Sequence, residues 1–169
     1  DRLNVDSEAI ALDANEVGWL DIYVASGGYH SFDIKSQLLK DRLYLNDGTG
    51  NFIKKESNLP IMNSSCLVSS DFNQDGFQDI FLGGGCIPSR YPESYNSQVL
   101  LNDGKGNFEV ATQKNTPELS LLTLVTDAKS VDLNDDGKMD LVTIGEWSAI
   151  NIFIYEDGHL KNASQRYFD

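Results

Sequence analysis

The feature that most constrains this chain is a nine-residue pattern of oxygen-bearing side chains. In residues 71–79 it places Asp, Asn, Asp and Asp at positions 1, 3, 5 and 9, with Gly at position 6. Residues 132–140 repeat the pattern, and both copies continue directly into apolar residues. Alternate side chains turn inward, the glycine takes a bend that a side chain would block, and the carbonyl at position 7 can add an oxygen. This spacing suits a hard cation and is typical of a calcium loop.

A third, incomplete copy of the pattern occupies residues 13–21, where Val17 replaces the carboxylate at position 5. The three copies begin 58 and 61 residues apart. A second motif keeps the same period, because Leu-Asn-Asp-Gly at residues 45–48 recurs at 101–104 and a shortened form closes the third unit at 155–160. Asn-Asp-Gly between apolar residues is typical of a hairpin turn. The chain is therefore interpreted as three copies of one unit.

Each repeat divides into four short stretches with the alternation and β-branched residues of strands. The expected strands are 8–12, 21–25, 41–45 and 51–55, then 65–70, 79–83, 97–102 and 107–112, then 124–132, 140–144, 149–155 and 159–164. Brief helical turns are expected only at 36–40 and 117–122.

Four antiparallel strands per repeat predict an all-β chain of three β-propeller blades. The blades are expected at residues 8–57, 64–113 and 123–166 of a single propeller segment. Three blades are too few for a ring of the usual size, so we expect a fragment of a larger propeller. Self-association that completes a ring is the alternative.

The composition argues against nucleic acid as a partner and against a membrane span. The net charge of −13 offers no basic face for nucleic acid. No apolar run approaches the roughly 20 residues of a membrane span, so no transmembrane segment is expected. With 40% hydrophobic residues the chain is expected to be globular.

Two cysteines leave two interpretations open. If residues 71–79 join two antiparallel strands, Cys66 falls opposite a residue between about 84 and 86, so a disulfide with Cys86 is geometrically possible. Such a bond would contribute about 3 kcal/mol and would indicate an oxidising compartment. The alternative is two buried free thiols.

The calcium-loop pattern running into a strand, with the later Leu-Asn-Asp-Gly turn, resembles the FG-GAP/VCBS repeat family of propeller blades. Residues 71–147 look closest to its cartilage-acidic-protein-like secreted branch, through the segments 87–92, 125–128 and 145–147. The resemblance extends from about Glu8 to Ser164. It implies a secreted or cell-surface protein that holds two calcium ions.

The resemblance also implies the ligands. They are Asp71, Asn73, Asp75 and Asp79 with the carbonyl of Phe77, and Asp132, Asn134, Asp136 and Asp140 with the carbonyl of Lys138. The first loop retains Asp13, Asn15 and Asp21 but lacks a carboxylate at position 5, so it is expected to be weak or empty. An EF-hand is excluded because the twelfth residues are Leu82 and Thr143. Acidic turns without metal remain the alternative for all three loops.

Strand alternation places the connections between the second and third strands of each repeat at the end opposite the aspartate loops. These connections carry aromatic and charged residues that suit a ligand face, namely Tyr29, Arg90, Tyr91, Tyr95 and Trp147, beside Glu93 and Glu146. The alternative is that these side chains pack beneath their own loops.

The favoured function is a calcium-stabilised binding or scaffold module, without catalytic activity, for a protein or glycan ligand. The alternative is part of a secreted enzyme, for example one that acts on polysaccharide. In that case its active residues would lie on the face opposite the aspartate loops or on missing blades. No pair of carboxylates is spaced convincingly for glycoside hydrolysis.

Overall fold

The computed structural model describes residues 3–28, 36–111 and 116–168. Within them the chain forms three four-stranded antiparallel sheets. The first contains β1 (Asp6–Leu12), β2 (Asp21–Ser26), β3 (Arg42–Asn46) and β4 (Phe52–Lys55). The second contains β5 (Ser64–Ser70), β6 (Asp79–Gly84), β7 (Gln98–Asn102) and β8 (Phe108–Val110). The third contains β9 (Val125–Val131), β10 (Asp140–Gly145), β11 (Asn151–Glu156) and β12 (His159–Asn162).

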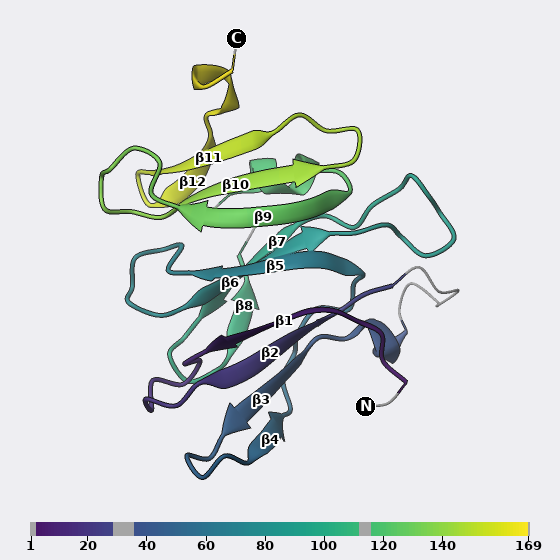
Figure 1. The fold of residues 1–169 in the computed structure, drawn as a ribbon, viewed down its shortest axis with the longest axis vertical. Helices are drawn as coiled ribbons and strands as arrows, with labels where there is room; N and C mark the ends of the chain where they lie inside the picture. The colour runs from purple at the N-terminus through teal and green to yellow at the C-terminus, as the bar shows by residue number, and fades with distance from the viewer. Residues whose placement is uncertain (1–2, 29–35, 112–115, 169) are drawn as a thin grey trace.

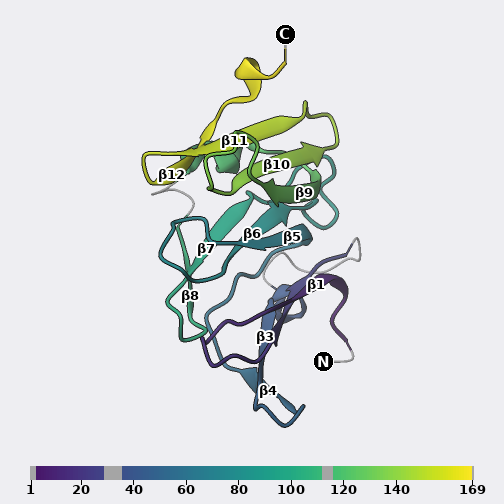
Figure 2. The same cartoon turned by 60° about the vertical axis from the view of Figure 1, so that its left-hand side comes forward.

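In each sheet the strands follow the order of the chain, so each repeat is an antiparallel meander. The sheets are stacked one above another, with the chain rising from the first to the third (Figure 1), and the turned view in Figure 2 shows the same stack. The first strands of the sheets, β1, β5 and β9, lie next to one another. These are the features of β-propeller blades, and the predicted all-β fold class is confirmed.

The hairpin turns use the chemistry that the sequence indicated. Asp47 accepts hydrogen bonds at Oδ1 from the backbone N–H groups of Thr49 and Asn51, and Asp103 does the same for Lys105 and Asn107. Gly104 has a φ of +70°, and a Cβ there would lie 2.6 Å from the Phe77 ring. Glycine is therefore required at this turn by both conformation and space.

The core lies between the sheets. One buried cluster, which includes Tyr23, Leu43 and Ile80, fills the space between the first and second sheets. Another, which includes Phe81, Leu141 and Phe153, fills the space between the second and third. The Tyr23 ring also meets the Phe108 ring edge to face, with centroids 5.8 Å apart. Because neighbouring blades share these clusters, each sheet is stabilised chiefly by the one beside it.

The expected helical turns are short 3₁₀ helices, Gln37–Leu39 and Pro117–Leu121, and a third lies at Ser164–Arg166. In the described part of the chain, no helix has the length and apolar character needed to cross a bilayer.

Of the two interpretations of the cysteines, the structure has the second, because Cys66 and Cys86 are both free and buried. Cys66 pairs with Gly83, and the register shifts between Ser64 and Cys66. Cys86 lies beyond β6 and pairs with Ser94 instead. The simple outward count from the loop therefore placed the two cysteines too close to one another in register.

Candidate metal-binding loops

The three aspartate loops, residues 13–21, 71–79 and 132–140, join the first and second strands of the sheets. They project from the left side of the stack in Figure 1, and we call this side the aspartate-loop end. Their backbones match, because the residue at position 4 has a φ of 58°, 61° or 58° and the glycine at position 6 has a φ of 86°, 94° or 82°. The incomplete first loop thus keeps the conformation of the complete ones.

In loop 71–79 the side chains at positions 1, 3 and 5 turn into the loop. Asp71 accepts hydrogen bonds from the backbone N–H groups of Asp75 (3.1 Å) and Gly76 (2.9 Å). Asn73 accepts at Oδ1 from the Asp75 N–H (3.0 Å) and donates from Nδ2 to Asp75 Oδ2 (2.8 Å). The Asp75 carboxylate in turn accepts from the Phe77 N–H at 2.9 Å. Three oxygen-bearing side chains therefore gather at one partly exposed point.

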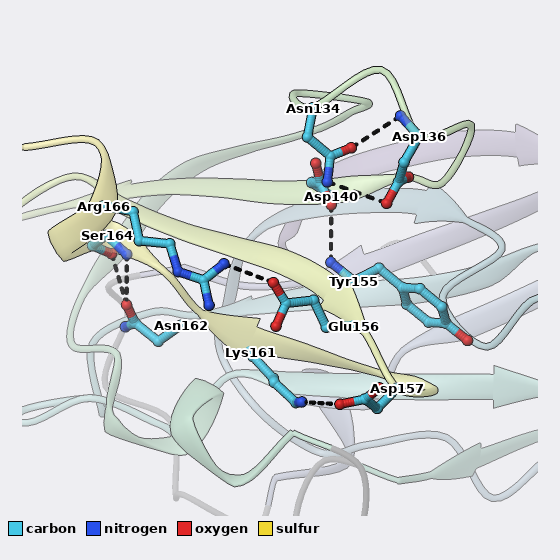
Figure 3. Close-up of polar contacts among 10 residues, drawn as sticks. All are labelled: Asn134, Asp136, Asp140, Tyr155, Glu156, Asp157, Lys161, Asn162, Ser164 and Arg166. Atoms are coloured by element: carbon cyan, nitrogen blue, oxygen red, sulfur yellow. Dashed lines mark hydrogen bonds and ion pairs between the residues drawn. The ribbon is translucent and has the colours of Figure 1, made fainter.

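Loop 132–140 repeats this arrangement. Asp132 accepts from the N–H groups of Asp136 (3.1 Å) and Gly137 (2.8 Å). Asn134 accepts from the Asp136 N–H (3.0 Å) and donates to Asp136 Oδ2 at 3.1 Å, and these two side chains face one another in Figure 3. Two loops from different repeats thus reach the same geometry.

The chemistry of these donors fits calcium. Carboxylate, amide and carbonyl oxygens are the ligands that calcium prefers, and an oxygen that accepts one hydrogen bond keeps a lone pair for a cation. The pKa of Asp79 rises to about 7, chiefly because the carboxyl is buried, and the neighbouring charges of Asp75 and Asp71 raise it further. This electrostatic crowding is what a bound cation would relieve.

Among the described residues no group of three or more His, Cys, Asp or Glu side chains is close enough to hold a metal ion. Each of the two complete loops instead brings two carboxylates together with the amide of an asparagine. Calcium binding by the predicted ligands remains a prediction.

The aspartate at position 9 has a second role that the sequence analysis missed. Asp21, Asp79 and Asp140 are all fully buried. One oxygen of each accepts from the N–H at position 2 of its own loop, at 2.9–3.0 Å. The other accepts from a backbone N–H of the third strand, at Asn46, Asn102 and Tyr155 respectively, at 2.8–2.9 Å. Figure 3 shows this contact between Asp140 and Tyr155.

Position 9 therefore ties each loop to the third strand of its sheet. The signal in the sequence was that Asp21 persists in the repeat whose loop has lost the carboxylate at position 5. An aspartate kept at position 9 in a loop with a weakened set of metal ligands is consistent with a structural role.

The first loop differs from the others only around position 5. Asp13 accepts from the N–H groups of Val17 (3.2 Å) and Gly18 (2.7 Å), as its counterparts do. Val17 offers no carboxylate, and Asn15 Oδ1 is buried with no hydrogen-bond partner among the described residues. The first loop thus has the shape of a site with a weakened set of donors.

At the opposite end of the sheets, the residues of the predicted ligand face separate into groups. Tyr91 and Trp147 lie together, since the Trp147 indole N–H donates to the Tyr91 hydroxyl at 2.9 Å. Arg90 is paired with Glu93. Tyr95 packs against the core between the first two sheets. Tyr29 lies outside the described residues.

Comparison with known families supports the sequence interpretation in part. Residues 13–82 match the FG-GAP-like repeat family. The match begins with the first aspartate loop and ends in β6, after the second loop. FG-GAP repeats are propeller blades, in agreement with the sheets observed. A search of curated proteins found no match to the chain.

Proposed function

We propose that this chain is a calcium-stabilised, extracellular β-propeller segment that serves as a non-catalytic binding or scaffold module. The observation that carries the proposal is the shared geometry of loops 71–79 and 132–140. In each, an Asp, an Asn and an Asp side chain gather at positions 1, 3 and 5 of the same backbone conformation. The match to the FG-GAP-like repeat family supports the propeller part of the proposal.

The loops would contribute stability. Without a cation, the carboxylates at positions 1 and 5 repel one another and the buried carboxylate at position 9. A calcium ion would supply the positive charge that offsets this repulsion. Asp71, Asn73 and Asp75 would bind it in the second blade, while Asp79 already holds the loop to β7 through the Asn102 N–H.

An extracellular location follows from the same proposal. Calcium sites on extracellular modules typically have dissociation constants of about 10⁻⁴ to 10⁻³ M, which matches the calcium concentration outside cells. The two free cysteines are buried, so the proposed location does not rest on a disulfide. The specific family branch suggested by segments 87–92 and 145–147 also belongs to this proposal.

Calorimetric titration of calcium into chelator-stripped protein tests the proposal, with thermal melts before and after. We expect two sites per chain and a higher melting temperature with calcium. At 100 times the dissociation constant, each site would add about 2.7 kcal/mol to the free energy of unfolding. Magnesium at the same concentration is the matched control. A chain that binds no calcium and melts at an unchanged temperature would reduce the loops to acidic turns.

A further inference from the structure

A cavity of about 330 Å³ lies where the first strands of the three sheets begin, at the end opposite the aspartate loops. Its walls come from the starts of β1, β5 and β9 and from the residues that follow β2, β6 and β10. A second hollow of about 360 Å³ is lined by Tyr91, Pro92 and Trp147. Leu124 and Glu146 line both, so the two hollows adjoin.

Three hydroxyl groups of the cavity wall use their protons in hydrogen bonds to backbone carbonyls. Ser7, Ser65 and Thr126 occupy the same position in the three repeats, six residues before each aspartate loop. Ser7 and Thr126 donate to the backbone carbonyls of Ala25 and Ile144 opposite them, at 3.2 and 3.3 Å. The Ser65 hydroxyl contacts two carbonyls, that of Gly83 at 3.2 Å and that of Val125 in the neighbouring sheet, and its single proton is used by one of them. The oxygen lone pairs are then what these residues offer to a ligand.

The charged groups of the wall are acidic. Asp6 and Glu146 line the cavity, and its described lining residues include neither Lys nor Arg. The charge of Asp6 is offset by its ion pair with Arg42, whereas the Glu146 carboxylate is bonded only to a neutral hydroxyl in the described structure. The negative charge of Glu146 also acts inside the cavity, since it adds to burial in raising the pKa of Cys86.

One buried group in the wall has no partner. Ser64 is fully buried and lines the cavity, and its hydroxyl makes no hydrogen bond within the described structure. Such a group carries a desolvation penalty, and because its oxygen is itself buried it adds no hydrogen-bonding group to the cavity surface.

The adjoining hollow presents aromatic rings. Trp147 is 86% exposed and Tyr91 is 59% exposed. The indole N–H donates to the Tyr91 hydroxyl, which donates to Glu146 Oε2 at 3.2 Å. This chain of hydrogen bonds fixes both rings and uses both of their donors. Trp147 also holds a φ of 57°, a backbone conformation that is strained for a large side chain and is often found at functional sites.

We infer that this cavity and its aromatic rim bind an organic cation, either a protonated amine or a guanidinium. The polar and aromatic groups described above are electron-rich. They are the faces of Trp147 and Tyr91, the Glu146 carboxylate and the lone pairs of the hydroxyls. Aromatic faces attract cations through their quadrupole, and a nearby carboxylate adds to that attraction. An anion would be repelled by Glu146. A neutral sugar could donate its hydroxyl protons to these acceptors but carries no charge for Glu146 to attract, so glucose is the competing ligand in the test below.

The site depends on a difference between repeats. The residues equivalent to Glu146 and Trp147 are Gly85 and Cys86 in the second repeat and two glycines, residues 27 and 28, in the first. A Cβ at Gly85 would lie 2.9 Å from the Asn63 carbonyl oxygen. The first two blades thus have glycines where the backbones approach closely, at Gly27 and Gly85, and the third blade supplies the carboxylate and the ring.

The inference rests on the proposed binding role and specifies its ligand class. The test is fluorescence titration of a Trp19→Phe variant, in which Trp147 is the only remaining tryptophan of the two in the chain. The probes are choline, N-acetylarginine amide and a short basic peptide, and the neutral control is dimethylbutanol, the carbon isostere of choline. We expect saturable binding of the cations and about tenfold weaker binding of the isostere.

Glu146→Gln in the same background should weaken cation binding about tenfold without changing the melting temperature. Glu93→Gln is the matched control, because Glu93 is an exposed acid paired with Arg90 outside both hollows, and it should leave binding unchanged. If choline or the arginine amide binds and the peptide does not, the site is assigned to free cations. Binding of the peptide alone would assign it to a basic side chain of a protein partner.

Equal affinity for the neutral isostere, or binding of glucose without binding of any cation, would overturn the inference. The titrations are run with calcium and with chelator. If calcium binds and raises the melting temperature but no cation binds, this inference fails while the proposed function stands. If cations bind to a chain that does not bind calcium, the inference and the proposed binding role stand, and the calcium part of the proposed function fails.

Discussion

The two ends of the blades differ in how closely the three repeats agree. At the aspartate-loop end, all three loops share one backbone conformation and one pattern of contacts from the aspartate at position 9. At the opposite end, the residues after the second strand are two glycines, then Gly85 and Cys86, then Glu146 and Trp147. Contacts repeated in every blade are those that the fold requires. Positions that differ between blades are free to carry a binding role.

The same comparison separates two roles within one loop. Position 9 keeps its aspartate in all three repeats, whereas position 5 is Val17 in the first repeat, Asp75 in the second and Asp136 in the third. Position 9 is buried and bonded to two backbone N–H groups, while position 5 lies at the exposed mouth of the loop. Position 9 therefore stabilises the fold, whereas position 5 is the position expected to bind the cation.

The largest effect is expected from Asp79→Ala. Two buried backbone N–H groups, those of Phe72 and Asn102, would lose their acceptor. Each unsatisfied group costs about 1–3 kcal/mol, so the free energy of unfolding should fall by about 2–6 kcal/mol. Urea denaturation in the presence of chelator measures this loss without any contribution from calcium.

Asp21→Ala is the matched variant, because Asp21 makes the same two contacts in the loop that lacks a carboxylate at position 5. It should lose as much stability as Asp79→Ala in chelator. If both variants were neutral in chelator, position 9 would act only through a metal ion, and the division of roles would be wrong. If Asp21→Ala alone were neutral, the two contacts would not be equivalent between the loops.

A smaller effect is expected from exchanging position 5 between loops. Asp75→Val should remove one calcium ion per chain, and with it about 2.7 kcal/mol of stabilisation at 100 times the dissociation constant. Val17→Asp should add one, because the first loop already has the required backbone conformation. Calorimetry counts the sites in each variant. Wild-type stoichiometry in both variants would show that position 5 does not bind calcium.

The sequence predicted most of the fold because the signals are local. The period of the loops, the Asn-Asp-Gly turns and the alternation along each strand all lie within a few residues. The role of position 9 was missed because Asp79 meets the N–H of Asn102, 23 residues away, in a strand whose register the sequence did not give. The choice between a disulfide and two free thiols also depended on register: with Ser70 opposite Asp79, a regular ladder places Cys66 opposite Gly83, three residues from Cys86.

The candidate binding face was predicted only in part for the same reason. The sequence indicated Tyr91 and Trp147 as exposed loop residues, but their contact joins positions 56 residues apart. Tyr95, which has the same chemical character, packs against the core instead. Residue type identifies candidates for a face, and only the packing of the blades decides which of them share it.

The smallest effect concerns Asp41, which directly precedes the third strand of the first sheet. The residues that directly precede the third strands of the other two sheets, Ser97 and Ile150, are not acidic. Asp41 accepts from the Ser26 N–H at 2.8 Å, whereas in the second repeat the Ser97 hydroxyl accepts from the Gly84 N–H at 3.0 Å. Burial raises the pKa of Asp41 from 3.8 to about 7, although its hydrogen bonds to Ser26 and Tyr23 lower it. The folded chain therefore holds this proton more tightly than the unfolded chain does.

Stability should consequently fall as the pH rises from about 4 to about 7, through the interval between the unfolded and folded pKa values of Asp41. Between pH 6 and pH 7 the loss is about 1 kcal/mol, since a full proton released per pH unit corresponds to about 1.4 kcal/mol. Asp41→Asn keeps an acceptor for the Ser26 N–H and removes the ionisation. Its unfolding free energy should lose the Asp41 part of the slope and keep the part due to Asp79, whose pKa also rises to about 7. Urea denaturation of both proteins at several pH values, in chelator, measures the difference. Parallel pH profiles would show that ionisation of Asp41 does not lower the free energy of unfolding. Asp41 in the first blade and Ser97 in the second would then not differ in their effect on the pH dependence of stability.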